Sequence, residues 1–430
     1  MNILIMGMGY VGVTTGLVFA EQGWNVTGLD TDSMKIQALS EGKLTFYEQG
    51  LDDLLLKHLK SGNIRFTSST KQAIRDNNII FLCVGTPSDK DGSADLQFIR
   101  GVAGSIGKYM NEYKLIAVKS TVPIDTNYKL VHWIREAQST PNEFDVVSNP
   151  EFLREGCALQ DALNPDRIII GSDSSYAIDI IKSLYGKISA PFFVTTARTA
   201  EMIKYASNAF LATKISYMNE LSRLCETIKV NISDVAEGIG MDHRIGKHFL
   251  KAGIGYGGSC FPKDIKALLY TAKEHNTDLS ILEKVYQVNQ TQYSHFLNVW
   301  EQKLGGFSHK TIAILGISFK PNTDDLREAP AISIIQELLE KQAIVKVHDP
   351  IAKLPSGLLS GKLQQFDSLE ETLDQCDAVI LCSEWDEYKL ADWTRMQAYM
   401  NQHFIFDGRN MLDSEQLIKL GYHYHGIANE

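Results

Sequence analysis

The first part of the chain alternates short apolar runs with stretches of helical spacing. Residues 2–7 (NILIMG) form an apolar run, residues 10–23 (YVGVTTGLVFAEQG) have helical spacing, and residues 25–30 (NVTGLD) form a second run that ends in an acid. Further strand-like runs lie at 78–87, 114–123, 145–151 and 167–172. Helices that alternate with strands apolar along their whole length predict a parallel sheet covered on both faces.

The pattern changes at about residue 199, where one long helical pattern begins. The segment RTAEMIKYASNAFLATKISYMNELSRLCETI contains no glycine or proline, and two more helical runs cover about 264–275 and 279–303. A mostly helical block of this kind is typical of a spacer or an oligomerisation element. We therefore expect a helical central domain over residues 199–304, built around a long central helix.

A second α/β pattern follows GGFSHK (305–310), which we interpret as a linker. Its predicted elements are a helix at 330–341 and strands at 311–319, 343–350, 377–384 and 403–410. The run IAILGISFKP is similar to ILIMGMGYVG near the start, and AVILCSEW is similar to IIFLCVGTP. The chain is thus expected to be α/β, with two Rossmann-like doubly wound domains, residues 1–198 and 305–430, flanking the helical middle. After its first strand the first copy has the glycines Gly7, Gly9 and Gly12, which can hold a pyrophosphate. Because the second copy keeps only the first of these three glycines, we expect it not to hold a pyrophosphate in the same way.

Composition and charge narrow the class of protein. A chain of 430 residues is too long for one ordinary core, so two or three domains are expected. The content of 44% hydrophobic and 22% charged residues is typical of a soluble globular protein. A formal net charge of −10 argues against a partner such as nucleic acid, which requires a basic face.

Location and metal content are also constrained by the sequence. The start, MNILIMGMGYVG, has no basic segment before its apolar run, so we expect no signal peptide. The apolar runs are shorter than a bilayer span, so we expect no membrane association and a cytoplasmic protein. The 6 cysteines lack the paired spacing of a metal site, and we predict thiols and no metal.

The strongest motif is G-x-G-x-x-G, formed by Gly7, Gly9 and Gly12 between a predicted strand and a predicted helix. One glycine makes the turn, one lets a pyrophosphate approach the backbone, and one lets the helix pack close to the strand. Asp30 ends the second strand, where an acid hydrogen-bonds the ribose hydroxyls. An acid there repels a 2′-phosphate, so NAD is favoured over NADP, although Lys35 nearby weakens that preference.

Other candidates follow the predicted strands, at the edge where such sheets bind ligands. Thr86 and Thr121 lie in the turns VGTP and STVP; they are placed to touch cofactor or substrate, or they belong to turns shaped by proline. Glu151 and Glu155 share one face if NPEFLREG is helical. Such acids can act as a base or orient water, and the alternative is a solvated helix start.

Polar groups on the long helix and in the C-terminal half add further candidates. Lys204 and Asn208 are four residues apart beside an apolar stripe, a pair that suits stabilisation of an oxyanion; the alternative is a lysine on a solvated face. Lys320, Arg327 and Arg409 follow predicted strands and are placed to meet phosphates, with ordinary surface charge as the alternative.

The stretch GIGYGGSCFPKD (253–264) sets Cys260 in a glycine-rich loop. Lys263 favours a thiolate, and Asp264 can act as a base or orient water. In a dehydrogenase a thiolate can hold an aldehyde as a thiohemiacetal, from which a second oxidation gives a thioester that water hydrolyses. A lone cysteine is more often a core residue, but beside a predicted NAD fold we interpret Cys260 as a nucleophile.

The ordered set of motifs resembles the UDP-glucose/GDP-mannose dehydrogenase family, most closely its UDP-glucose 6-dehydrogenases. The motifs are GMGYVG, STVP, NPEFLREG, KYASNAFLATKIS, GIGYGGSCFPKD, GISFKPNTDDLREAP, SEWDEY and FDGRN, and they span essentially the whole chain. The resemblance implies NAD-dependent oxidation of the C6 hydroxyl of UDP-glucose to UDP-glucuronate, for surface polysaccharide, with two NAD per turnover. It also implies a homodimer that buries the helical middle.

The resemblance also implies roles for single residues. Cys260 is the implied nucleophile, Lys204 and Asn208 the oxyanion pair, and Asp264, with Thr121 and Glu151, the group that positions water. The implied cofactor contacts are Gly7, Gly9, Tyr10, Val11, Gly12, Asp30, Lys35, Thr86, Thr121, Glu155 and Arg327. The implied substrate contacts are Glu151, Phe152, Leu153, Glu155, Lys204, Asn208, Phe249, Lys251, Gly257, Lys320, Arg409 and, across the dimer interface, Arg244.

Three alternatives stay open at the level of sequence. The first is a dehydrogenase of another nucleotide sugar, such as GDP-mannose or a UDP-N-acetylhexosamine. The second is a non-catalytic regulator that binds NAD and a nucleotide sugar. The third is a one-step alcohol dehydrogenase, which would form one NADH per substrate and would not need Cys260.

Overall fold

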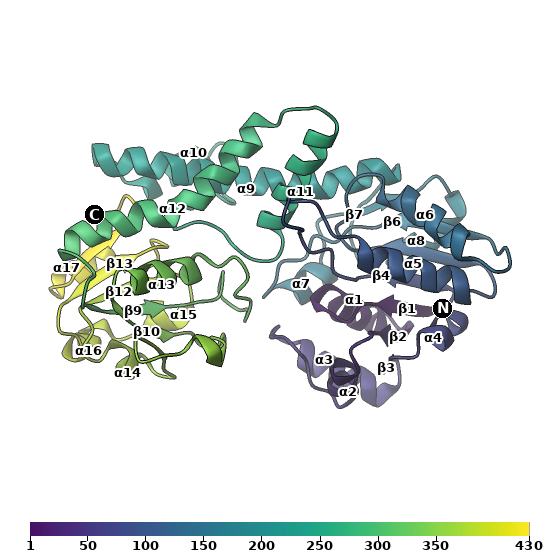
Figure 1. Cartoon of the computed structure of the whole chain (residues 1–430), viewed down its shortest axis with the longest axis horizontal. Coiled ribbons are helices and arrows are strands. Elements are labelled where there is room, and N and C mark those ends of the chain that lie inside the picture. The colour runs from purple at the N-terminus through teal and green to yellow at the C-terminus, as the bar shows by residue number, and fades with distance from the viewer. Residues whose placement is uncertain (430) are drawn as a thin grey trace. The chain divides into compact units, whose positions relative to one another are not determined.

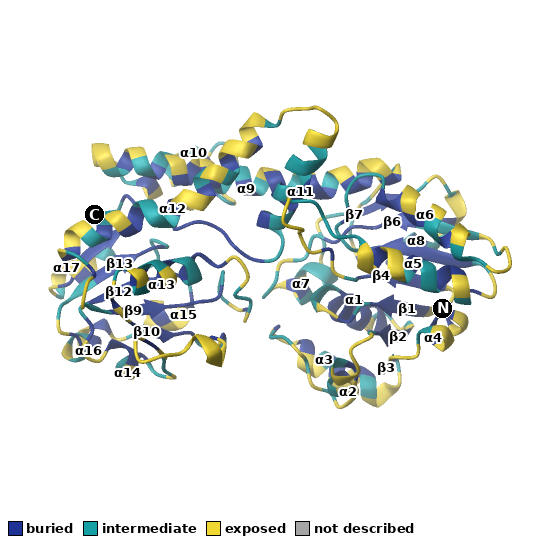
Figure 2. Ribbon diagram, viewed as in Figure 1, coloured by how far each residue is buried: buried dark blue, intermediate teal, exposed yellow. Residues whose placement is uncertain are grey.

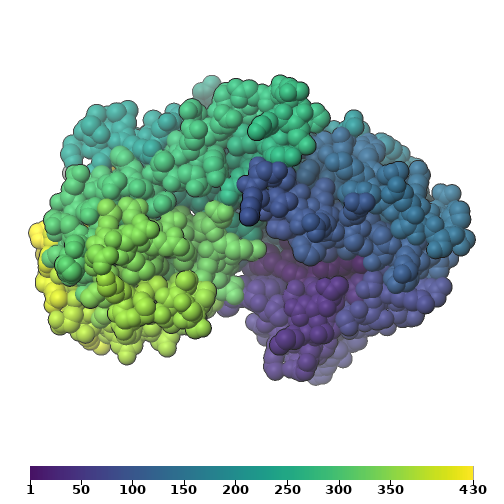
Figure 3. All heavy atoms as spheres, in the orientation of Figure 1, coloured from purple at the N-terminus to yellow at the C-terminus, as the bar shows by residue number. Residues whose placement is uncertain are grey.

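The computed structural model describes residues 1–429, and these divide into two units that each contain one sheet (Figure 1). Unit 1 comprises residues 1–207 and 266–277, and unit 2 comprises residues 208–265 and the chain from 278 onward. With all heavy atoms drawn, side chains fill the space between the ribbon elements inside each unit (Figure 3). Between residues 1 and 429 no helix is long and apolar enough to cross a membrane.

In the described part of the chain the sheet of unit 1 has 8 strands in the order β3-β2-β1-β4-β5-β6-β7-β8. The strands are β1 (Asn2–Met6), β2 (Asn25–Leu29), β3 (Ile64–Thr67), β4 (Ile79–Leu82), β5 (Lys114–Val118), β6 (Phe144–Ser148), β7 (Ile168–Gly171) and β8 (Phe192–Thr195). The predicted strands of this unit all form, whereas the short strands β3 and β8 were not predicted.

The prediction of a parallel sheet holds from β3 through β6 but is wrong for the next pair. Strand β7 pairs with β6 in the antiparallel sense, through Ser148 and Gly171, and β8 is parallel to β7. The only helix between β6 and β7 in the described chain is α7 (Ala158–Leu163), which has 6 residues. A helix of about 9 Å is too short to carry the chain back along a face of the sheet for a parallel crossover.

Helices cover both faces of this sheet, as the apolar strands predicted. Alternate residues of β1 enter opposite cores: Ile3 and Ile5 pack on one face, and Leu4 and Met6 on the other. Helices α1 (Tyr10–Glu21), α3 (Leu51–Ser61) and α8 (Ser175–Leu184) contribute to the first core. The second core takes side chains from α4 (Thr70–Asp76), α5 (Gln97–Tyr109) and α6 (Thr126–Ala137). Helix α2 (Ser33–Ser40) follows β2. The central residues of β1, β2, β4, β5 and β7 are buried, whereas those of the edge strand β8 are exposed (Figure 2).

The predicted long helix is confirmed as α9 (Ala197–Ile228), with 32 residues. The boundary between the units falls after Ser207, inside this helix. The other helices of the middle segment are α10 (Ile232–Gly240), α11 (Phe261–Glu274) and α12 (Ser280–Leu304). The glycine-rich stretch that contains Cys260 ends where α11 begins.

Over the described residues, the sheet of unit 2 has 6 strands in the order β11-β10-β9-β12-β13-β14, and its neighbouring pairs are parallel. The strands are β9 (Thr311–Leu315), β10 (Ile344–His348), β11 (Leu363–Gln365), β12 (Ala378–Leu381), β13 (Phe404–Asp407) and β14 (His423–Gly426). The helices are α13 (Pro330–Glu340), α14 (Leu369–Leu373), α15 (Asp386–Leu390), α16 (Trp393–Met396) and α17 (Ser414–Lys419), with short 3₁₀ turns η1 (Ser356–Leu358) and η2 (Gln397–Tyr399). Strand β9 again sends alternate side chains into two cores.

The similarity between the two sheets extends to the turn after the first strand. Gly7 follows β1 with φ +97°, and Gly316 follows β9 with φ +85°, a conformation that favours glycine. A Cβ on Gly7 would lie 2.7 Å from the Cys83 carbonyl oxygen, and a Cβ on Gly316 would lie 2.5 Å from the Ser383 Cβ. The first fingerprint glycine is therefore kept in both sheets because the chain turns tightly there against the neighbouring strand end.

Candidate active site

The fingerprint loop of unit 1 forms an open cradle at the start of α1. A Cβ on Gly12 would lie 1.8 Å from the Gly7 carbonyl oxygen, so the strand end and the helix pack as closely as the motif requires. A Cβ on Gly9 would meet none of the described atoms within 4 Å. Gly9 is also the N-cap of α1 and has no side chain to cap it, so the first N–H groups of the helix remain available to an anion. These features fit a dinucleotide pyrophosphate.

Asp30 is fixed beside this loop as an ionised carboxylate. Its oxygens accept hydrogen bonds from Met8 N at 2.8 Å and Asp32 N at 3.0 Å, and Lys35 Nζ lies 3.1 Å away. Burial opposes ionisation, but these N–H groups and Lys35 together lower the pKa of Asp30 below its ordinary value. Lys35, which weakened the preference for NAD, is thus ion-paired with the acid that favours NAD.

The two predicted threonines lie in turns that touch. Thr86, after β4, is buried, and its Oγ1 donates to the Thr121 carbonyl oxygen, after β5, at 2.8 Å. The two turns therefore hold each other at the carboxyl edge of adjacent strands.

The segment that carries Glu151 and Glu155 is not helical, so the condition under which both acids would share a helix face is not met. Residues 149–154 form an extended loop, and α7 starts only at Ala158. Leu153 N donates to Glu151 Oε2 at 2.5 Å, a local bond that competes with helix formation, and Gly156 has φ +75°. The loop directly follows β6, and its residues Asn149 and Glu151 are buried.

Glu151 forms a buried ion pair with Lys204. The Lys204 Nζ lies 3.0 Å from Glu151 Oε1, and the two side chains are 4% and 6% exposed. The alternative of a lysine on a solvated face is therefore wrong. The sequence had linked Lys204 with Asn208, and the hydrogen bond to Glu151 joins residues 53 positions apart, which no local pattern reveals.

An arginine that the sequence did not single out also lies in this part of unit 1. The guanidinium of Arg167 lies 4.2 Å from the Phe152 ring centroid, and Lys204 Nζ lies 5.3 Å from the same centroid. Arg167 also donates to Ser207 Oγ at 3.3 Å. Two cations thus lie within cation–π distance of the ring of a predicted substrate-contacting residue. The only sequence signal was the position of Arg167 at the start of a strand.

In unit 2, Asp264 and Asn208 form a buried polar pair near Cys260. Asn208 Nδ2 donates to Asp264 Oδ2 at 2.6 Å, and Lys263 Nζ lies 2.8 Å from Asp264 Oδ1. Asp264 is 1% exposed and lies in the first turn of α11, where its N–H donates to the Cys260 carbonyl oxygen at 2.9 Å. The positive end of the helix dipole and Lys263 both stabilise this carboxylate.

Cys260 differs from most other cysteines of the chain. It is half-buried immediately before α11, and its Sγ lies 3.6 Å from Ser259 Oγ. Burial raises the pKa of Cys83, Cys376 and Cys382 to about 12, so these three are inert thiols at neutral pH. A thiol at the start of a helix has the opposite environment, because the helix dipole stabilises a thiolate. Residues 1–429 contain no group of three or more His, Cys, Asp or Glu suited to a metal ion.

The backbone of the glycine-rich loop is held by amide side chains from α9 and α12. Asn289 accepts from Tyr256 N at 2.9 Å and donates to its carbonyl oxygen at 3.0 Å. Gly253 N donates to Asn219 at 2.9 Å, and its carbonyl oxygen accepts from Gln292 at 3.0 Å. These three amides were not predicted from the sequence, where the only signal was a polar position within an apolar helical stripe.

The loop has little room for larger side chains. A Cβ on Gly257 would lie 2.2 Å from the Glu328 carbonyl oxygen. Phe249 adopts φ +64°, unusual for a bulky residue, and its ring lies 6.3 Å from that of Phe261. The loop therefore has one well-defined backbone path, which suits recognition by main-chain groups.

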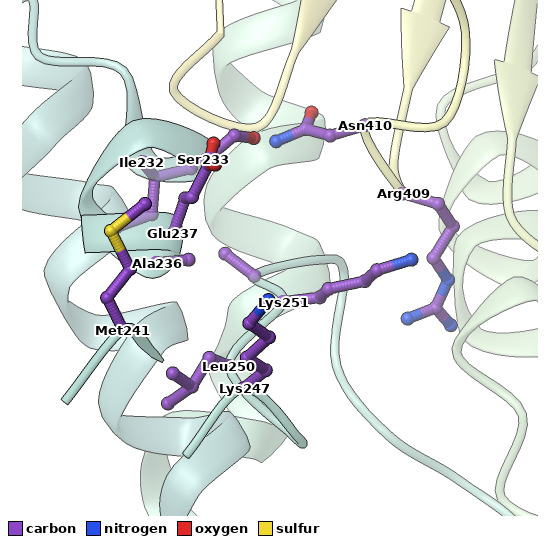
Figure 4. A pocket seen from close by; sticks show the side chains of 11 residues that line it. Ile232, Ser233, Ala236, Glu237, Met241, Lys247, Leu250, Lys251, Arg409 and Asn410 are labelled. Carbon is purple, nitrogen blue, oxygen red and sulfur yellow. The ribbon is translucent and has the colours of Figure 1, made fainter. Parts of the chain in front are cut away.

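A cavity of about 350 Å³ lies in unit 2 beside this loop (Figure 4). Lys251 extends across it toward Arg409, so two cations face the same space (Figure 4). Arg409 donates from Nε to the Cys382 carbonyl oxygen at 2.8 Å and from Nη1 to the Gly255 carbonyl oxygen at 2.9 Å. Burial lowers the pKa of Arg409, an environment in which an added anion would be stabilising. The lining is formed by Ile232, Ser233, Ala236, Glu237, Met241, Lys247, Leu250, Lys251, Ala252, Arg409 and Asn410.

The remaining basic candidates lie at the surface of unit 2. Arg244 is exposed and pairs with Asp242 at 2.6 Å, and Arg327 is exposed and pairs with Asp325 at 2.7 Å. Lys320 Nζ lies 5.4 Å from the centroid of the Phe319 ring. Arg244 and Arg327 are thus each paired with an acid two positions earlier in sequence.

The chain matches three consecutive parts of one family. These are the NAD binding domain of the UDP-glucose/GDP-mannose dehydrogenase family over residues 1–189, its central domain over 198–291 and its UDP binding domain over 313–414. The UDP-glucose 6-dehydrogenase TuaD of Bacillus subtilis is 42% identical over 99% of this chain and 93% of its own length.

Two solved structures extend the comparison. A UDP-glucose dehydrogenase from the hyperthermophilic archaeon Pyrobaculum islandicum has a TM-score of 0.93 at 36% identity, covering 100% of this chain and 98% of its own. A UDP-D-ManNAc dehydrogenase from Pyrococcus horikoshii has a TM-score of 0.88 at 28% identity, covering 100% of this chain and 99% of its own.

Proposed function

The chain belongs to the UDP-glucose/GDP-mannose dehydrogenase family, and from this premise we propose that it is an NAD-dependent UDP-glucose 6-dehydrogenase. The proposal is carried by Cys260, half-buried before α11 and next to the buried Asp264–Asn208 pair. It is supported by the names of full-length relatives at about 40% identity, which include two UDP-glucose 6-dehydrogenases of Bacillus subtilis.

The proposed reaction takes the C6 hydroxyl of UDP-glucose to a carboxylate in two oxidations. Bound NAD would accept one hydride from C6 in each of them. The alcohol first loses a hydride and a proton to give an aldehyde, and the Cys260 thiol adds to this carbonyl as a thiohemiacetal. Loss of the second hydride and a proton leaves a thioester, and water then releases the carboxylate and restores the thiol.

Asp264 and Asn208 are placed to serve the cysteine. The Asp264 carboxylate is oriented by the Asn208 amide and by Lys263, so it can hold a water or accept a proton at Oδ1 or Oδ2. Asn208 can also donate toward an oxyanion at C6 when it exchanges its bond to Asp264. Both side chains are held in place by the hydrogen bond between them and are buried from solvent.

Glu151 and Lys204 form the second proposed group. Lys204 is one helical turn from Asn208 on α9, and its ammonium can stabilise negative charge on the C6 oxygen. Glu151 holds that ammonium at 3.0 Å and, with Thr121, is placed to relay a proton. Glu155 is proposed to lie near the nicotinamide and the sugar, and Phe152 and Leu153 to contact the substrate.

The fingerprint loop and the adjacent turns are proposed to hold NAD. The N–H groups at the start of α1 suit the pyrophosphate, and Asp30 suits the ribose hydroxyls. Arg327 is proposed as a contact from the C-terminal half. The other proposed contacts are Gly7, Gly9, Tyr10, Val11, Gly12, Lys35, Thr86, Thr121 and Glu155.

The cavity beside the glycine-rich loop is proposed to take the UDP part of the substrate. A diphosphate would be stabilised by Lys251 and Arg409, and the fixed backbone from Phe249 to Gly257 offers main-chain groups to a nucleotide. Lys320 is proposed as a further contact. The UDP-D-ManNAc enzyme among the structural relatives keeps another nucleotide sugar as a second candidate.

We further propose that the chain is a homodimer assembled on α9. Phe210, Tyr217, Leu224 and Ile228 lie on one side of the helix and are 65%, 54%, 55% and 56% exposed. A stripe of large apolar side chains more than half exposed is typical of a protein interface. In this dimer Arg244 would reach the sugar bound to the partner subunit.

The proposed setting follows the family. We propose a cytoplasmic enzyme whose UDP-glucuronate supplies surface polysaccharide, with an NAD-binding domain at 1–198, a central domain at 199–304 and a UDP-binding domain at 305–430. The order of the three family matches supports that division.

A panel of nucleotide sugars tests the proposal. The purified chain is incubated with NAD and with UDP-glucose, GDP-mannose or a UDP-N-acetylhexosamine, and NADH formation is followed by the absorbance of the reduced nicotinamide. UDP-glucose is expected to give the highest kcat/KM. A higher value for another sugar would reassign the substrate, and saturable NAD binding without turnover of any sugar would favour a regulator.

A further inference from the structure

A buried carboxylate outside the proposed catalytic groups joins the cofactor loop of unit 1 to the loop that carries Glu151. Glu48 lies in the connection between α2 and α3 and is 2% exposed. Within the described chain its oxygens accept from the Tyr10 hydroxyl, from Gly156 N at 2.6 Å and from Ala158 N at 2.7 Å. The three donors are 38, 108 and 110 positions away in sequence, so the contact exists only in the folded unit.

The donors belong to two different parts of the site. Tyr10 is the first residue of α1, directly after Gly9 of the fingerprint. Gly156 and Ala158 end the extended loop and start α7. The Tyr10 hydroxyl lies 3.1 Å from the Arg154 carbonyl oxygen as well, so this ring contacts the loop directly and through Glu48. Movement of the loop relative to the start of α1 would break these bonds together.

The chemistry of the contact favours one fixed arrangement. A buried carboxylate needs several donors, and here two come from rigid backbone N–H groups and one from a phenol. Burial and the hydrogen bond to Glu48 raise the pKa of Tyr10, so the phenol stays protonated and remains a donor at neutral pH. The ring is also supported by Phe46, whose centroid lies 5.1 Å away.

We propose that Glu48 is a positioning residue of the dehydrogenase: it locks the loop of Glu151, Phe152 and Glu155 to the first turn of α1. This inference rests on the proposed function, because the loop and the fingerprint are its proposed substrate and cofactor groups. A simple cap of α7 would need only the two backbone bonds. The bond to Tyr10 adds a connection that a cap does not require, and it joins the two surfaces between which a hydride must pass.

The main test replaces Glu48 with glutamine, which has nearly the same shape. One oxygen of the carboxylate accepts from Ala158 N and the other from Tyr10 and Gly156 N, so an amide nitrogen at either place faces at least one backbone N–H. Hydride transfer is sensitive to displacements of about 1 Å, which cost roughly 100-fold in rate. We therefore expect kcat per folded enzyme to fall at least about 10-fold, with the KM for NAD changed less than about threefold.

Three further measurements separate positioning from a loss of stability. The deuterium isotope effect on kcat, measured with UDP-glucose deuterated at C6, should rise in Glu48→Gln because hydride transfer becomes slower. Amide exchange of residues 156–158 should be faster, a readout that does not depend on turnover. Tyr10→Phe removes one hydroxyl and leaves both backbone bonds, and Glu41→Gln, at an exposed glutamate nearby, is the matched control.

The outcomes are distinct. Tyr10→Phe should lower kcat and raise the isotope effect in the same direction, and the double variant should be little worse than Glu48→Gln alone. The proposal is overturned if folded Glu48→Gln keeps a kcat within twofold of wild type with an unchanged isotope effect. If Glu48→Gln does not fold, wild-type kinetics in Tyr10→Phe overturn it instead. If the wild type does not oxidise UDP-glucose, the proposed function fails, whereas unchanged amide exchange in the variant contradicts the lock itself.

Discussion

Replacing Lys204 with methionine would remove the cation that faces the buried Glu151 carboxylate. The pair is 3.0 Å apart with side chains 4% and 6% exposed, so little water is available to solvate the charge that remains. Removing one partner of a buried pair typically costs about 3–5 kcal/mol. For a unit of this size, 1 kcal/mol corresponds to about 2–4 °C, so the melting temperature should fall by about 6–20 °C.

A double-mutant cycle tests whether the unpaired Glu151 charge causes the loss of stability in Lys204→Met. Glu151→Gln in the Lys204→Met background removes the stranded charge, and most of the lost stability should return. Lys57→Met is the control, because Lys57 pairs with Glu21 in an exposed ion pair, which contributes about 0–1 kcal/mol. Thermal unfolding by circular dichroism measures five proteins: the wild type, Lys204→Met, Glu151→Gln, the double variant and Lys57→Met. A loss below about 1 kcal/mol in Lys204→Met, or no recovery in the double variant, would refute the reasoning.

Three other predictions concern separate parts of the chain. Because the pKa of Asp30 is lowered in the folded protein, its contribution to stability is present above the unfolded value of about 3.9 and is lost as pH falls. In Asp30→Asn the melting temperature should therefore fall less steeply than in the wild type as the pH is lowered below about 5. Parallel plots of melting temperature against pH for the two proteins would contradict this. Arg409→Met should weaken UDP binding about 10–100-fold by calorimetry, as loss of charged hydrogen bonds implies, and unchanged UDP affinity would show that the nucleotide binds elsewhere. Phe210→Glu combined with Leu224→Glu should give monomers by light scattering, whereas a dimer that survives both changes would exclude this stripe as the interface.

Most strands of both sheets and the long helix α9 could be predicted because they depend on local periodicity. Continuous apolar runs gave β1, β4 and β9, and the absence of glycine and proline gave α9. The direction of β7 could not be predicted, since it depends on how the chain leaves β6 rather than on the residues of the strand. Strands β3, β8, β11 and β14 were missed. The sequences of β3 (IRFT), β11 (LQQ) and β14 (HYHG) contain polar residues and form no continuous apolar run, and the central residues of β8 are exposed.

The residues of the candidate site also fall into those that the sequence could reveal and those that it could not. The fingerprint glycines, Asp30 and Cys260 could be found from sequence because a motif of fixed spacing marks each of them. The partner of Lys204 could not, because Glu151 reaches it only through the tertiary fold. Glu48 and Arg167 carried no motif, and their contacts with Tyr10 and Phe152 appear only once distant segments are packed together.

The central claim is that one active site carries out both oxidations through Cys260. The most direct measurement is the amount of NADH formed per UDP-glucose consumed, with the sugar limiting and NAD in excess. The account predicts two NADH per sugar for the wild type and loss of acid formation in Cys260→Ser. A ratio of one for the wild type, or two NADH per sugar at a near wild-type rate in Cys260→Ser, would contradict it.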